Sequence, residues 1–411
     1  MTRLLSESPT TLPVHRQILL FTWLGWIFDF YDLNLLSLLL ASTTIAQDLG
    51  MDRAEQSWVI GASLGFSAAG GLLGGWLADR YGRKPILMLT IVVYSIGTFA
   101  SGFVVDGSTL LLARAITGLG VGGEWAVAHA LVGETVPPHV RGRYGAYLQS
   151  GAAFGLALST GIGNFVAPVI GWRLVFILSA LPALIVIAVR RYMPESDLWQ
   201  ANRSEHAQGH FRELAVLVSP KVRKATFLAL AVTMCAMAAY WLKNSWLPLY
   251  YHNVRGLTLR DAAILMWVGH AGQLIGYLVF GPAADRFGRR PSYSLFCLLK
   301  AGGLATITLG WSLVAGDLWM LYAVAFLLGL GEGNWGGVGP LLAELFPTNV
   351  RAAALGIIYN FSRGVQLFAP VLITAIAAEY TFAQGIALGA AFALMAGALI
   401  WALPETKGIR L

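Results

Sequence analysis

The same charged loop occurs twice in this chain, as GWLADRYGRKP at residues 75–85 and as GPAADRFGRRP at residues 281–291. Each copy follows one apolar run and precedes another. Three further pairs repeat at nearly the same offset, about 206 to 210 residues: Gly123-Glu124-Trp125 with Gly333-Asn334-Trp335, Glu134-Thr135-Val136-Pro137 with Glu344-Leu345-Phe346-Pro347, and Pro194-Glu195-Ser196 with Pro404-Glu405-Thr406. Four matches at one offset indicate an internal duplication, with the two copies in the same orientation.

The composition indicates a chain that lies almost wholly in a membrane. Of its 411 residues, 57% are hydrophobic and only 12% are charged, and the mean hydropathy is +0.66. A soluble domain carries about 25% charged residues, because its surface faces water. A spanning helix needs about 20 mainly apolar residues, and charged breaks divide this chain into twelve such spans: 17–46, 55–78, 85–105, 108–133, 142–167, 171–190, 225–251, 259–284, 291–313, 317–343, 350–377 and 380–402.

The expected fold class is therefore an all-α membrane protein whose twelve transmembrane helices form two six-helix bundles related by a pseudo-two-fold axis. We expect an N-terminal bundle at 1–191, a cytoplasmic linker loop at 192–224 and a C-terminal bundle at 225–411. Basic residues concentrate in every second loop, beginning with Arg80 and Arg83. This bias predicts that those loops and both termini are cytoplasmic, in a multi-pass protein of the cell (inner or plasma) membrane.

Several other classes of function lack support in the sequence. The net charge of +7 does not indicate nucleic-acid binding, because the basic residues lie between apolar runs and not on one solvated face. The chain has no Gly-x-x-x-x-Gly-Lys-Ser/Thr run for a nucleotide, no Cys/His spacing for a metal and no nucleophile motif. We therefore expect no cofactor and no enzymatic activity. Cys235 and Cys297 fall inside apolar runs and are expected to be free thiols.

The repeated motifs resemble those of the major facilitator superfamily. The loops at 75–85 and 281–291 are similar to its signature loop, and Arg114 with the glycines that follow it resembles its second motif. Two further segments, GWIFDFYD at 25–32 and YNFSR at 359–363, are most similar to proton symporters of sialate, lactate and related organic anions, with the aromatic-acid:proton symporters close behind.

This resemblance implies the major facilitator fold and secondary active transport. The expected activity is proton-coupled symport of a small organic anion, a monocarboxylate or a related acid, by alternating access. The expected partners are that anion, protons and the lipid bilayer, and we expect a monomer. Two alternatives stay open: a proton-driven exporter of a drug or organic cation, and a non-transporting membrane sensor on the same fold.

Three carboxylates within the spans are candidates for carrying the coupled proton: Asp29, Asp32 and Glu124. A charged side chain inside the membrane costs about 2.5–3.5 kcal/mol or more, so each calls for an explanation. Asp29 and Asp32 lie about 18 Å and 22 Å from the start of the first span, and residues three apart share a helix face. Two carboxylates so close in a medium of low dielectric constant do not both ionise easily. Which one carries the proton stays open.

Arg363 is the predicted anchor for the anion, because a guanidinium offers a planar fork that fits a carboxylate. Its counterpart in the repeat is Ala153, so the fold itself does not require a cation there. An ion pair of Arg363 with Asp29, Asp32 or Glu332 is the alternative. Other candidates for contacting the substrate are polar side chains inside the spans: Asn360, Tyr359, Tyr31, His270, Gln273, Lys243, Asn334 and Glu332.

The repeated loops predict a cytoplasmic gate far from the substrate. Their charged residues are expected to form ion-pair latches that hold the inner gate closed and set the balance between inward- and outward-facing states. The residues concerned are Asp79, Arg83, Glu134 and Arg141 in the first half and Asp285, Arg289, Glu344 and Arg351 in the second.

Overall fold

The computed structural model describes residues 11–135, 141–181, 222–346 and 351–407, together with residues 195, 200, 217, 219 and 220. Every regular element in these ranges is a helix, which confirms the all-α class. In the described residues both cysteines are buried and free, as predicted.

Each half of the chain forms a series of long helices joined by short connections. In the first half these are α1 (Thr11–Ser42), α2 (Ile45–Asp48), α3 (Arg53–Tyr81), α4 (Arg83–Ser101), α5 (Gly107–Thr135), α6 (Arg141–Gly161), the π-helical turn η1 (Ile162–Val166), α7 (Ala167–Ile170) and α8 (Trp172–Ser179). In the second half they are α13 (Arg223–Leu249), η2 (Tyr250–Val254), α14 (Leu259–Phe287), α15 (Arg289–Thr308), α16 (Trp311–Val314), α17 (Leu318–Gly331), η3 (Glu332–Asn334), α18 (Trp335–Leu345), α19 (Arg351–Gly364), η4 (Val365–Leu367), α20 (Phe368–Glu379), α21 (Phe382–Leu399) and η5 (Ile400–Ala402).

The membrane spans agree with the sequence-based prediction. Within the described residues, eight helical segments are long and apolar enough to cross a membrane: α1, α3, α4, α6 with α7, α13 with η2, α14, α19 with α20, and α21 with η5. The other four predicted spans overlap α5, α8, α15 and the pair α17 and α18, although residues 182–190 of the span at 171–190 lie outside the described residues. The twelve-helix fold is therefore confirmed.

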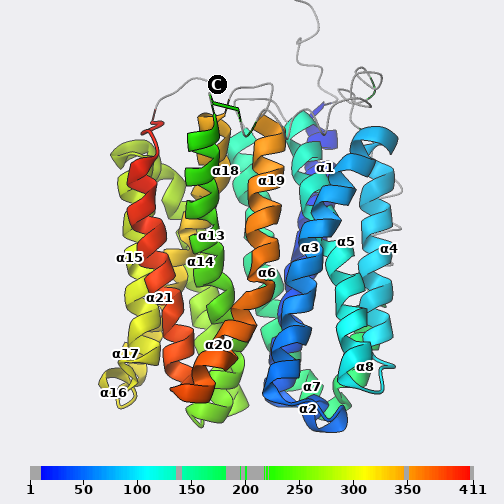
Figure 1. The fold of residues 1–411 in the computed structure, drawn as a ribbon, viewed down its shortest axis with the longest axis vertical. Coiled ribbons are helices and arrows are strands. Elements are labelled where there is room, and N and C mark those ends of the chain that lie inside the picture. The colour runs from blue at the N-terminus through cyan, green and yellow to red at the C-terminus, as the bar shows by residue number, and fades with distance from the viewer. Residues whose placement is uncertain are drawn as a thin grey trace, which may run out of the picture.

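The helices lie side by side along the long axis of the molecule, with α1–α8 in one half and α13–α21 in the other (Figure 1). One end carries the repeated loops, and we call it the loop end. The opposite end carries α2, α7 and α16 (Figure 1), and we call it the far end. The two halves meet where α3 packs against α19 and α20, α6 against α14, and α1 against α13.

Each repeated loop is a turn made by a single glycine. Gly82 separates α3 from α4 with a φ of 110°, and Gly288 separates α14 from α15 with a φ of 102°. Residues with a side chain rarely adopt these positive φ angles, whereas glycine does so at little cost. The duplicated glycine is therefore required by the sharp reversal of the chain.

Glycines also allow the helices of each bundle to approach closely. A side chain at Gly122 would place its Cβ 1.8 Å from the carbonyl oxygen of Ser67 in α3. Between the halves, a Cβ at Gly61 would lie 2.3 Å from the carbonyl oxygen of Leu367. Small residues serve this purpose in membranes, where helices associate by packing and not by exclusion of water.

Candidate functional site

A small cavity lies between the two bundles, and we call it the central pocket. Its volume is about 20 Å³, which is room for about one or two water molecules. Its walls are mainly aromatic and come from both halves: Phe30, Gln149, Met237, Tyr240, Trp241, Tyr277, Trp335, Tyr359 and Arg363. An organic acid is larger than this cavity, so the bundles must move apart before one can enter.

Arg363 of α19 is the charged residue among these lining residues. Its side chain is only 1% exposed. In the described part of the chain, neither Nη1 nor Nη2 has a hydrogen-bond partner. Two of the three carboxylates that the sequence offered to Arg363 are engaged elsewhere, because Asp32 pairs with Arg114 and Glu332 with two lysines. A buried guanidinium with two unsatisfied nitrogens is costly, and an anion in the central pocket would satisfy it.

The two polar neighbours of Arg363 on α19 point to different places. Tyr359 lines the central pocket and packs edge-on against Trp335, with 6.4 Å between the ring centroids. It also lies within electrostatic reach of both Arg363 and Asp29. Asn360 lies at the interface with α3, since a Cβ on Gly71 would be 2.3 Å from the Asn360 Oδ1 atom. Asn360 is therefore placed at the contact between the bundles, outside the lining of the central pocket.

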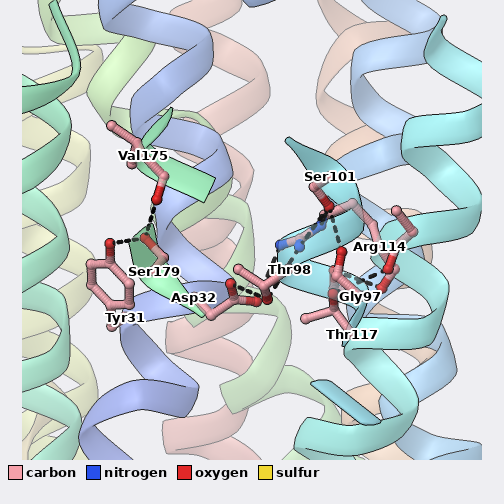
Figure 2. A network of polar contacts seen from close by, with 11 residues as sticks. Tyr31, Asp32, Gly97, Thr98, Ser101, Arg114, Thr117, Val175 and Ser179 are labelled. Carbon is pink, nitrogen blue, oxygen red and sulfur yellow. Dashed lines mark hydrogen bonds and ion pairs between the residues drawn. The ribbon is translucent and has the colours of Figure 1, made fainter. Parts of the chain in front are cut away.

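Asp32 takes part in a hydrogen-bonded network inside the first bundle (Figure 2). Its Oδ2 atom lies 3.1 Å from Nη1 of Arg114 in α5, and its Oδ1 atom accepts a hydrogen bond of 2.7 Å from Thr98 in α4. Arg114 also donates to Ser101, at 3.2 Å from Nε and 2.9 Å from Nη2. The neighbouring Tyr31 forms a hydroxyl–hydroxyl hydrogen bond with Ser179 at the end of α8 (Figure 2).

The structure thus separates the two aspartates that the sequence placed on one helix face. Asp32 is directed to the cation Arg114, whereas Asp29 is fully buried on α1 within electrostatic reach of Tyr359. The predicted competition between two adjacent negative charges is reduced, because Arg114 offsets one of them. Glu124, the third candidate, is fully buried in α5 of the same bundle.

The second bundle contains a buried cluster with more positive than negative charge. Glu332 lies 2.7 Å from the Lys243 ammonium and 2.6 Å from that of Lys300. Lys300 also donates a 3.1 Å hydrogen bond to Asn334. All four side chains are at most 7% exposed. Lys243 is therefore part of an ion-pair cluster and does not extend to the membrane surface.

A second cavity, which we call the outer cavity, lies beside this cluster. Its volume is about 30 Å³, and it is lined by Asn34 of α1 and by residues of α13, α14, η2 and α17 that include Lys243, Asn244, His270 and Gln273. Gln273 donates a 2.7 Å hydrogen bond to Tyr277, which lines the central pocket. His270 is hydrogen-bonded to Thr160 of α6 at 3.2 Å, across the junction of the bundles.

The contacts between the bundles are dense at the far end. The hydroxyl groups of Ser57 and Thr374 lie 2.8 Å apart. The indole of Trp267 donates a 3.0 Å hydrogen bond to the Ala157 carbonyl and stacks on Phe165 at 5.6 Å. These contacts join the two bundles at the far end.

At the loop end, Arg289 bridges two of the predicted latch carboxylates. It lies 2.6 Å from Asp285 and 3.1 Å from Glu344. Glu405 accepts hydrogen bonds from the backbone N–H groups of Arg289 and Arg290 at the start of α15. Burial raises the pKa of Glu405, but the backbone hydrogen bonds outweigh burial and hold the pKa below its usual value. Arg83 is buried at the start of α4, and the side chains of Asp79, Glu134, Arg141 and Arg351 lie outside the described residues.

Lys300 and Glu405 are among the residues that the sequence-based site candidates did not include. Lys300 lies inside an apolar run, and the cost of an intramembrane charge was the signal that could have found it. Glu405 entered only as part of a repeated motif, although a glutamate placed to accept from a helix N-terminus is a recognisable arrangement.

The comparisons with known proteins agree with this architecture. A family model described as Major Facilitator Superfamily matches residues 22–272 and 271–409. The chain is 30% identical to a probable 4-methylmuconolactone transporter of Cupriavidus pinatubonensis, over 94% of this chain and 89% of the relative. It is 29% identical to the sialic acid transporter NanX of Escherichia coli, over 90% and 89% of the two chains.

Among solved structures, the crystal structure of a D-xylose-proton symporter has a TM-score of 0.75 with 20% sequence identity, and the match covers 97% of this chain and 100% of that one. This likeness concerns the fold. The sequence-based resemblance to this family and to its organic-acid branches is confirmed. The chain therefore belongs to the Major Facilitator Superfamily and is a multi-pass membrane transporter.

Proposed function

We propose that this protein is a proton-coupled symporter that carries a small organic anion into the cell. The observation that carries the proposal is the buried guanidinium of Arg363, whose two terminal nitrogens have no partner among the described residues. Ligand sites are commonly apolar cavities with a few polar groups that fix the orientation of the ligand. The central pocket has this character, with one cation and a mainly aromatic wall.

The lining favours a flat carboxylic acid. Aromatic side chains pack well against planar groups, at ring-centroid separations of about 4.5–7 Å. Tyr240 is 5.2 Å from Trp241 and 6.0 Å from Trp335, so the wall already has this geometry. The two relatives named above are transporters of a muconolactone and of sialic acid by name, which is consistent with an organic-acid substrate.

The distribution of buried charge supports coupling of an anion to protons. In the described spans, the acidic candidates Asp29, Asp32 and Glu124 belong to the first bundle, whereas Lys243, Lys300 and Arg363 belong to the second. An anion attracted to the second bundle would then face carboxylates that repel it until they bind protons. In this proposal Asp29 carries the proton, because Asp29 and Arg363 both lie within electrostatic reach of Tyr359, whereas Asp32 is paired with Arg114.

The direction of transport rests on the orientation of the spans. The positive-inside bias places the loop end in the cytoplasm, so the far end would face outward. The contacts of Ser57 with Thr374 and of Trp267 with Ala157 would then form the outer gate. Alternating access would break these contacts while the latches of the loop end, including Arg289 with Glu344, hold the inner gate.

A cation exporter is less favoured by the central pocket, because an organic cation there would lie beside the positive charge of Arg363. A sensor on the same fold would bind the acid without moving it. Purified protein in liposomes separates the three functions when a pH gradient, acidic outside, is imposed. The proposal predicts uptake of radiolabelled benzoate or sialic acid that exceeds the uptake by protein-free liposomes and collapses when a protonophore removes the gradient.

The matched control is Arg363→Gln, which keeps a polar side chain of similar reach but removes the charge. Gradient-driven expulsion of preloaded tetraphenylphosphonium in place of acid uptake would show an exporter, and binding of an acid without flux would show a sensor. Either outcome would contradict the symport proposal.

A further inference from the structure

The outer cavity lies beside a cluster in which two ammonium groups share one carboxylate. Lys243 and Lys300 both contact Glu332, at 2.7 Å and 2.6 Å. No second carboxylate within the described ranges is in ion-pair contact with either lysine. The three side chains are buried, so the cluster holds an uncompensated positive charge in a medium of low dielectric constant. Such a charge is stabilised when an anion approaches it.

A second, independent feature of this cavity is a donor without an acceptor. Asn244 is 8% exposed and lines the outer cavity. Its Nδ2 atom has no hydrogen-bond partner among the residues that the structure describes. A buried polar group without a partner is rare and calls for an explanation. Lys243 and Asn244 are adjacent residues that both line this cavity, so an anion there would lie close to a cation and to an N–H donor without an acceptor among the described residues.

The size of the cavity limits what it accepts. About 30 Å³ is room for about two water-sized groups, which fits a halide ion or one carboxylate group but not a whole organic acid. We propose that the outer cavity, at Lys243 and Asn244, is an anion-binding site separate from Arg363. It takes either free chloride or a second carboxylate of the transported acid, a diacid whose first carboxylate is bound by Arg363.

The position of the site connects it with transport. Asn34 of the first bundle and Lys243 of the second line the same cavity, so an anion there neutralises the cluster and contacts both bundles. The Gln273–Tyr277 hydrogen bond joins the outer cavity to the central pocket. A diacid that reaches from Arg363 would pass this bond. The alternative in which the site binds a second carboxylate, which we call the carboxylate arm, rests on the proposed function. The alternative in which it binds chloride, the chloride arm, does not.

The chloride arm is tested with the purified full-length protein by thermal unfolding at constant ionic strength. Sodium chloride is exchanged for sodium 2-(N-morpholino)ethanesulfonate, whose anion is too large for the cavity. If chloride binds, it raises Tm of the wild type by several degrees. Asn244→Asp puts a carboxylate beside Lys243 in place of the anion and abolishes the chloride effect. Asn244→Leu removes the donor and weakens the effect without raising a new charge.

The matched control is Ser245→Ala, which removes a neighbouring buried hydroxyl that also has no hydrogen-bond partner among the described residues but does not line the outer cavity. It should keep the full chloride effect. If Asn244→Asp fails to fold, Asn244→Leu and Lys243→Gln give the same test, because Lys243→Gln leaves Lys300 and Glu332 as a neutral pair.

The carboxylate arm compares hexanedioate with hexanoate in calorimetric titrations. If the second carboxylate occupies the outer cavity, chloride has no effect on Tm and hexanedioate binds at least ~10-fold more tightly than hexanoate. In Asn244→Asp this preference for the diacid disappears, whereas the affinity for hexanoate is unchanged. The absence of both a chloride effect and a diacid preference in the wild type overturns the proposal, as does either effect persisting unchanged in Asn244→Asp. Failure of the proposed function is distinguished by another result: Arg363→Ala would then bind the monoacid and the diacid as tightly as the wild type does.

Discussion

The guanidinium of Arg114 in α5 lies 3.1 Å from the carboxylate of Asp32 in α1, with both side chains at most 3% exposed. Thr98 and Ser101 of α4 supply further hydrogen bonds to this pair. The pair and these hydrogen bonds join three helices of the first bundle, and one of the two neighbouring aspartates of α1 thereby has a partner.

Removing one partner of the Asp32–Arg114 pair should destabilise the folded protein far more than removing both partners. Asp32→Asn leaves a buried guanidinium without its anion, which typically costs about 3–5 kcal/mol. The double variant Asp32→Leu, Arg114→Met removes both charges and should recover a large part of that loss. Thermal unfolding of the purified variants measures this. Equal destabilisation by the single and double changes would contradict the importance of the pair.

Asp29→Asn should uncouple flux from the pH gradient, because the amide imitates the protonated acid and cannot release a proton. Exchange of substrate across the membrane should continue, whereas accumulation against a gradient should stop. Asp32→Asn and the double variant are tested alongside, in liposomes with and without an imposed gradient. Retained accumulation in all three would move the proton to another group, with Glu124 next in line.

Arg363→Ala should weaken substrate binding at least ~30-fold. Losing one partner of a buried, charge-assisted contact typically costs about 2–5 kcal/mol, and Arg363 has no other partner among the described residues. Arg363→Lys keeps the charge but loses the fork, so it should recover only part of the affinity. Calorimetric titration with the transported acid decides this. Unchanged affinity in a folded Arg363→Ala protein would remove the basis of the organic-anion proposal.

Arg289→Ala and Glu344→Gln should slow transport and leave substrate affinity within a few fold. Their ion pair lies at the loop end, so it affects the balance of conformations and not the contacts with substrate. Asp79→Asn and Arg83→Ala should behave alike in the first half. Transport rates in liposomes and equilibrium binding are measured on the same preparations. A large loss of binding in any of them would count against the latch.

Glu405 should make stability depend on pH at the acidic end. Its pKa is lowered in the folded protein because hydrogen bonds from backbone N–H groups outweigh the effect of burial. The stabilisation is therefore complete above the ordinary glutamate pKa of about 4.3 and is lost as the pH falls through the lower, folded value. Tm of the wild type should fall more steeply below about pH 4.3 than Tm of Glu405→Gln. Parallel pH profiles of the two proteins would refute this role of Glu405.

The sequence by itself determined the fold and the family of this protein. The spacing of apolar runs, the duplicated loop with its glycine, and the alternation of basic loops are properties of the order of residues along the chain, and reading them requires no knowledge of contacts between helices. The same holds for Arg363, which the sequence marked as an intramembrane charge that its repeat partner Ala153 lacks. A charge inside an apolar run is visible without knowledge of its neighbours.

The tertiary structure decided which charged side chains form ion pairs with one another. It paired Asp32 with Arg114, gathered Lys243 and Lys300 around Glu332, directed Asn360 to the bundle interface and left the Arg363 nitrogens without a partner among the described residues. These partners come from different helices, and in the cluster of Lys243 with Glu332 they are 89 residues apart in sequence. Such pairings depend on how each helix is rotated and how closely glycines let it approach its neighbours, and the period of a single helix does not contain that information.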